Sequence, residues 1–193
     1  MTTTITRVYN SYDEGRDVVN ALEAAGIDSG AISLVSNQSE DTSPTSDGAA
    51  AGAGVGTAIG GGAGLLAGLG VMAIPGLGPV VAAGWLAATA AGAVAGAVTG
   101  AAAGGLIGAL TESGMSNEEA GVYAEGVRRG GALVSVRVED EQKDRVLNIL
   151  DTHEPWDMSE RSENWRRDGW TKFDPNARPL TPEEIMRQRN TYL

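Results

Sequence analysis

The feature that most limits how this chain can fold is a long stretch without charged residues, Gly48 to Thr111. It consists mostly of glycine and alanine, and Pro75-Gly76-Leu77-Gly78-Pro79 divides it into two arms. Residues four apart lie on one face of a helix, and glycine recurs at that spacing in both arms. Rows of small residues let helix backbones approach closely. The stretch therefore predicts an antiparallel helical hairpin packed along Gly52, Gly56, Gly60, Gly64, Gly68, Gly84, Gly92, Gly96, Gly100, Gly104 and Gly108.

A flexible linker is the alternative interpretation of so much glycine and alanine. Linkers are rich in serine and charged residues, whereas this stretch carries large apolar side chains such as Leu65, Leu66 and Leu106. A four-residue register on both sides of a proline turn is also not expected of a linker. We therefore favour a packed hairpin over 48–111, preceded by a polar linker over 37–47.

The sequence on either side of the hairpin predicts alternating strands and helices. Before it, a strand over Ile5–Tyr9 precedes a helix that ends near Ala25, and a second strand follows over 31–36. Ser11 and Glu14 form a capping box, in which each residue's side chain bonds a free backbone N–H group at the start of the helix. These residues predict a β-α-β unit.

A similar unit follows the hairpin. A helix that starts at a second capping box, Ser116 with Glu119, leads to a strand over 132–138, a helix over 140–153 and a brief strand over 156–158. The residues over 146–151 also resemble those over 18–23. Residues 1–36 and 112–160 together therefore predict an α+β domain, a ferredoxin-like βαββαβ sheet interrupted by the Gly/Ala-rich hairpin.

The C-terminal residues, 161–193, contain little that could form a separate core. A third capping box, Thr181 with Glu184, predicts one short helix that ends near Asn190. Aromatic rings are the natural anchors of such a tail. We expect it to lie either on its own domain or on a neighbouring subunit, anchored by Trp156, Trp165, Trp170 and Phe173.

Composition excludes several classes of function. The formal net charge is -11, so the basic surface of a nucleic-acid binder is missing. There is no cysteine and a single histidine, and no nucleophile-base set or metal-ligand cluster is recognisable. We therefore expect a protein that is not an enzyme, with no catalytic residue, cofactor, metal or small-molecule ligand. The first residues do not resemble a signal peptide, which predicts a cytoplasmic location.

Three blocks of sequence resemble a family of small bacterial general-stress or heat-induced stress proteins with a YflT-like domain. They are VYNSYDEGRDVVNALEAAGI over 8–27, GLLAGLGVMAIPGLGPVVAAG over 64–84 and EGVRRGGALVSVRV over 125–138. The resemblance covers most of residues 5–175 and implies a general stress role without a defined reaction.

A hairpin that is apolar on every side needs a partner that keeps it from water. Each arm is long enough to span a bilayer. However, no Lys or Arg occurs between Arg16 and Arg128, so the basic residues that orient membrane spans are missing. Burial against other copies of the chain is the other solution, and it predicts a homo-oligomer or filament. We favour self-assembly. The alternative is association with a membrane, namely the inner membrane.

Overall fold

The computed structural model describes residues 2–37, 70–74, 76–89 and 105–191. It is a mixed α/β structure around a five-stranded antiparallel sheet of order β1-β5-β2-β4-β3. The strands are β1 (Thr2–Tyr9), β2 (Ile32–Asn37), β3 (Gly70–Ile74), β4 (Gly78–Gly84) and β5 (Ala132–Glu139). The α-helices in the described ranges are α1 (Tyr12–Ala24), α3 (Gly105–Glu112), α4 (Asn117–Arg128), α5 (Lys143–Thr152), α6 (Met158–Arg167) and α7 (Pro182–Thr191), and residues 85–89 are also helical.

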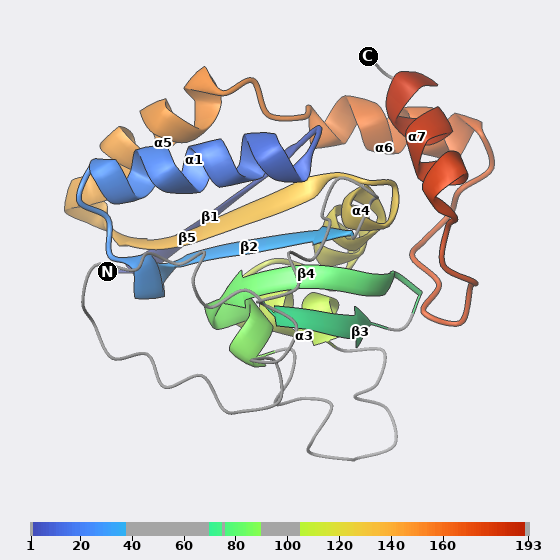
Figure 1. Ribbon diagram of the computed structural model, residues 1–193, viewed down its shortest axis with the longest axis horizontal. Helices are drawn as coiled ribbons and strands as arrows, with labels where there is room; N and C mark the ends of the chain where they lie inside the picture. The colour runs from blue at the N-terminus through green and yellow to red at the C-terminus, as the bar shows by residue number, and fades with distance from the viewer. Residues whose placement is uncertain (1, 38–69, 75, 90–104, 192–193) are drawn as a thin grey trace, which may run out of the picture.

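Helices cover both faces of the sheet (Figure 1). Side chains alternate between the two faces along a strand, so β5 sends Leu133 into one core and Val134 into the other. Helices α1 and α5 cover the face of Val134, and α3 and α4 cover the face of Leu133. Nearly continuous burial along β2 and β5 follows from this covering of both faces.

The capping residues expected from the sequence begin the described helices. Ser11 accepts a hydrogen bond from the Glu14 N–H at 3.2 Å, and Ser116 accepts one from the Glu119 N–H at 3.2 Å. Thr181 and Glu184 bond each other's backbone N–H groups at 3.3 and 2.9 Å. Each cap satisfies donors that the first helical turn leaves free.

The predicted helical hairpin is wrong for residues 70–84. Gly70–Ile74 and Gly78–Gly84 are paired strands, and β4 also pairs with β2, for example Leu34 with Ala83. Val71, Val80 and Val81 favour extended backbone because they are β-branched. The centre of the uncharged stretch therefore adds two strands to the sheet instead of forming the adjoining ends of two long helices.

The brief strand expected over 156–158 is also absent. The Trp156 N–H donates to the Val8 carbonyl at 2.7 Å, which is one contact with the outer side of β1. The chain then enters α6, because Asp157 accepts hydrogen bonds from the N–H groups of Ser159 and Glu160 at 2.9 and 3.0 Å. The cap at Asp157 ends the extended segment after a single backbone bond to β1.

Candidate functional site

The turn between β3 and β4 lies directly against the C-terminal segment 168–191, which we call the C-terminal strap. A Cβ atom built on Gly76 would come within 2.8 Å of the Asp174 carbonyl oxygen and 3.0 Å of the Phe173 ring. One built on Gly78 would come within 2.8 Å of Pro179. Gly76 has φ 78°, a conformation that side chains other than glycine rarely adopt. The turn is therefore shaped to fit under the strap.

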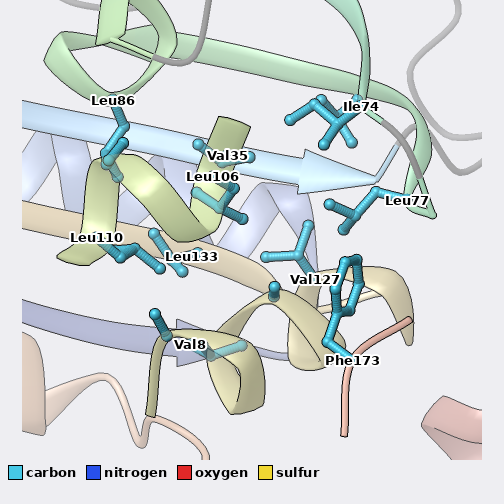
Figure 2. Packing of buried hydrophobic residues seen from close by; sticks show 14 of the residues in the cluster. Val8, Val35, Ile74, Leu77, Leu86, Leu106, Leu110, Val127, Leu133 and Phe173 are labelled. Carbon is cyan, nitrogen blue, oxygen red and sulfur yellow. The ribbon is translucent and has the colours of Figure 1, made fainter. Parts of the chain in front are cut away.

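The same turn is held from inside the sheet. Asn37, at the end of β2, is buried, and its Nδ2 donates to the Leu77 carbonyl at 3.1 Å. Leu77 and Phe173 reach one apolar cluster beside Val127 of α4 (Figure 2). The hairpin that belongs to the uncharged stretch is thus fastened by the sheet on one side and by the strap on the other.

The four aromatic residues expected to anchor the tail lie against the body of their own chain. Trp156, Trp165 and Phe173 are buried in the cluster on the α4 face, and Trp170 is partly buried against it. Trp165 is 1% exposed and meets Trp170 edge to face, with ring centroids 5.9 Å apart. Of the two positions left open by the sequence, the described tail occupies the one on its own domain.

A buried charge joins α4 to the strap. The Glu125 side chain is fully buried and pairs with Arg129 at 2.7 Å and with Arg128 at 3.3 Å. Arg128 also donates to the Arg178 carbonyl at 3.1 Å, and Arg129 donates to Gln188 Oε1 at 2.7 Å. The guanidinium of Arg129 lies 4.9 Å from the centre of the Trp165 ring. One carboxylate therefore orients two arginines that hold the strap near its middle, at Arg178, and near its C-terminal end, at Gln188.

A second ion pair lies within the strap. Arg178 donates to the two carboxylate oxygens of Glu184 at 2.7 and 2.5 Å. The hydrogen bonds from Arg178, together with the one that the Thr181 N–H donates, lower the pKa of Glu184 from 4.5 to about 2. Bidentate pairs of this kind hold a fixed geometry. The pair sets the direction in which α7 leaves the preceding loop.

Because the folded pKa of Glu184 lies below its unfolded value, its contribution to docking of α7 is present above pH 4.5 and is lost as the pH falls towards about 2. We expect Arg178→Gln to raise the pKa of Glu184 towards 4.5, measured by NMR titration of its carboxyl carbon. Arg187→Gln is the control, since Arg187 acts on the pKa of Glu184 only through its charge, without a hydrogen bond, and its effect should be smaller. Equal shifts in the two variants would contradict the assigned cause.

Two of the predicted packing glycines are described, and neither supports the expected helix contact. Gly84 ends β4 at φ 84°, and a Cβ atom there would lie 2.1 Å from the Ile32 carbonyl oxygen. The missing side chain of Gly84 lets the end of β4 lie close to the backbone of β2. Gly108 is in α3, and a Cβ atom on it would meet no described atom within 4 Å. The other predicted positions lie outside the described residues: Gly52, Gly56, Gly60, Gly64, Gly68, Gly92, Gly96, Gly100 and Gly104.

The described residues show no group of three or more His, Asp or Glu side chains placed to hold a metal ion.

A polar groove of about 440 Å³ lies beside Trp156. The Nε1 of Trp156 donates to Asn10 Oδ1 at 2.5 Å, and the Arg161 guanidinium lies 3.8 Å from the centre of its ring. Within the described ranges, every helix is too short or too polar to cross a membrane.

Comparison of the chain with models of protein families, with curated proteins and with solved structures gives no match.

Proposed function

We propose that this chain is a non-enzymatic protein that assembles with copies of itself through its uncharged stretch, with a general stress role as the resemblance of its three sequence blocks implies. The observation that carries the proposal is the absence of any charged residue over 48–111. Such a length of apolar sequence is stable only where it is removed from water, and other copies of the chain provide the same apolar surface.

The anchoring of this stretch supports the proposal. It contributes β3, β4 and α3 to the body, and the strap holds the turn between β3 and β4. A segment that is fixed to a rigid body loses less conformational entropy on association than a free chain does. Anchoring of the described part of the stretch in this way therefore lowers the entropic cost of association through the stretch.

We further propose that the sheet is a ferredoxin-like arrangement extended by the hairpin. Strands β1, β5 and β2 are adjacent and antiparallel, α1 joins β1 to β2, and α5 follows β5. This is the pattern of the first three strands of βαββαβ. The fourth strand, which would lie beside β1, is reduced to the contact between Trp156 and Val8.

The test is the size of the full chain purified without detergent, measured by light scattering on a sizing column and by negative-stain microscopy. We expect a large homogeneous species. Gly60→Leu combined with Gly96→Leu should reduce its mass, because the added side chains keep apart the glycine rows that we expect to meet. Ala58→Leu with Ala102→Leu adds similar volume off those rows and should leave the mass unchanged.

A monomer in the absence of detergent would contradict self-assembly. Membrane association is the alternative hypothesis. Extraction with alkaline carbonate distinguishes it from self-assembly. Protein that stays in the membrane pellet and is released only by detergent would favour the membrane, whereas release into the soluble fraction as a large particle would favour self-assembly.

A further inference from the structure

The C-terminal strap is attached to the body by few buried side chains. Over the described part of residues 168–191, only Phe173 and Ile185 are buried. Its polar bonds to α4 are single hydrogen bonds from Arg128 and Arg129. Segments with few buried apolar side chains open at a lower free energy than the core on which they lie. The strap is therefore expected to open before the sheet does.

The interface under the strap also contains buried donors without an acceptor. In the described ranges, three such donors lie on its residues: Arg128 Nε and the indole Nε1 atoms of Trp165 and Trp170. Arg128 bonds the Arg178 carbonyl, Trp170 belongs to the strap, and Trp165 meets Trp170 edge to face. A buried donor without an acceptor opposes docking, because water satisfies it in an open state. The docked strap is thus held less tightly than a fully paired interface.

The chain between α6 and Phe173 is able to act as the joint of the strap. Gly169, Thr171 and Lys172 are exposed. Gly169 has φ 94°, and a Cβ atom built on it would meet nothing within 4 Å. Rotation of the backbone at these three residues breaks no buried contact of their own side chains. The strap is therefore able to leave α4 while α6 stays in place.

Opening of the strap removes one of the two supports of the turn between β3 and β4. When docked, the strap places Phe173 in the cluster that contains Leu77 (Figure 2), and its Asp174 carbonyl oxygen lies 2.8 Å from a Cβ atom built on Gly76. Strand β3 pairs only with β4 in the described sheet. After opening, the bond from Asn37 to the Leu77 carbonyl is the support that is left.

We propose that the strap is a latch for assembly: it opens as a unit from the folded body, and its docked state holds the β3–β4 turn in the form that assembles. This inference rests on the proposed function, since the turn lies within the uncharged stretch. Ordering the turn beforehand reduces the entropy that association must remove. Docking and assembly then favour each other equally, because coupling between two equilibria is reciprocal. Release of the strap therefore dissociates the particle.

Hydrogen exchange of the unmodified full chain in low urea tests the opening itself. The amides of α7 should exchange at least about tenfold faster than those of β5 and should share one urea dependence, as a single cooperative unit does. Exchange of α7 at the rate of β5 would overturn the latch, because the strap would then open only when the whole molecule unfolds.

A disulfide between the strap and α4 tests the coupling to assembly. A Cβ atom built on Gly121 would lie 3.8 Å from the Phe173 Cβ, the usual separation across a disulfide. The chain has no cysteine, so Gly121→Cys with Phe173→Cys introduces a single pair. Oxidation locks the strap and reduction frees it in one and the same protein. Gly121→Ser with Phe173→Ser is the matched control, and it should respond to neither condition.

Light scattering over a dilution series compares the two states. The oxidised protein should stay assembled down to a concentration about tenfold lower than the reduced protein, a typical size for coupling between two sites. Equal dilution curves for a particle present in both states would overturn the latch and leave self-assembly intact. A monomer in both states, and in the unmodified chain, would instead overturn self-assembly and the latch with it.

Gln188→Ala is the second variant, in case the cysteine pair fails to fold. It removes the acceptor of the Arg129 bond at the C-terminal end of the strap. We expect faster exchange of the α7 amides and dissociation of the particle at a higher concentration, at unchanged exchange of β5. Faster exchange of α7 with an unchanged dilution curve would show that the strap opens without controlling assembly, and would overturn the latch.

Discussion

Replacing Glu125 with alanine is expected to lower the free energy of unfolding by about 3–5 kcal/mol, since it leaves two arginines without the buried carboxylate that pairs with them. The Arg128 and Arg129 side chains are only 15% and 14% exposed, so water cannot fully replace Glu125. The loss is measured by urea unfolding followed by circular dichroism. The strap should also be released, because both arginines hold it, and limited proteolysis should cut first within residues 168–181.

Glu118→Ala is the matched control on the same helix. Glu118 is 84% exposed and lies 3.6 Å from Arg166, so its loss should cost less than about 1 kcal/mol. A Glu125→Ala variant as stable as Glu118→Ala would show that the pairing with Arg128 and Arg129 does not hold the strap.

The role of Glu125 could not be predicted from the sequence, and the reason is physical. Glu125, Arg128 and Arg129 have the spacing of an ordinary ion pair on the surface of a helix. Burial comes from residues 50 or more positions later in the chain, such as Arg178 and Gln188, which lie over the two arginines. Local spacing contains no information about a contact at that distance.

The parts of the fold that were predicted are those specified by local chemistry. The capping pairs begin α1, α4 and α7 because a side-chain acceptor and a free N–H lie within three residues of each other. Strand β5 was also predicted, since Ala132 to Val138 is rich in β-branched apolar residues, interrupted only by Ser135 and Arg137, which is typical of a strand.

Strands β3 and β4 were missed because glycine spacing was given more weight than turn chemistry. Two runs with β-branched residues, separated by a few residues that include glycine, are also the signal of a hairpin. Pro79 is a further signal, since a proline inside a helix removes a hydrogen bond. In the structure it lies near the start of β4, opposite Ala73.

Helix α6 was missed for the opposite reason. Its residues are polar on nearly every side, so no apolar stripe indicated a helix. The available signal was the cap, because Asp157 stands three residues before Glu160. The burial of Trp165, which gives this helix its position, depends on α4 and Trp170, and these are tertiary contacts.

Trp165→Ala is expected to lower the free energy of unfolding by about 3–5 kcal/mol, the range for removing a large aromatic side chain from a core. Trp165 is almost completely buried, packs on Trp170 and carries the Arg129 guanidinium over its ring, so its loss leaves a cavity and removes the cation–π contact of Arg129. Urea unfolding measures the change.

Met186→Ala provides the control for Trp165→Ala, because Met186 is 54% exposed and its truncation should change stability by no more than about 0.5 kcal/mol. The two variants together distinguish a tail that belongs to the core from one that merely rests on it. If the tail only rested on the surface, Trp165→Ala would accelerate proteolysis within 168–191 but leave the urea midpoint of the sheet unchanged. Since Trp165 shares one cluster with Val8 of β1 and Leu133 of β5, we expect the midpoint to fall for the whole molecule.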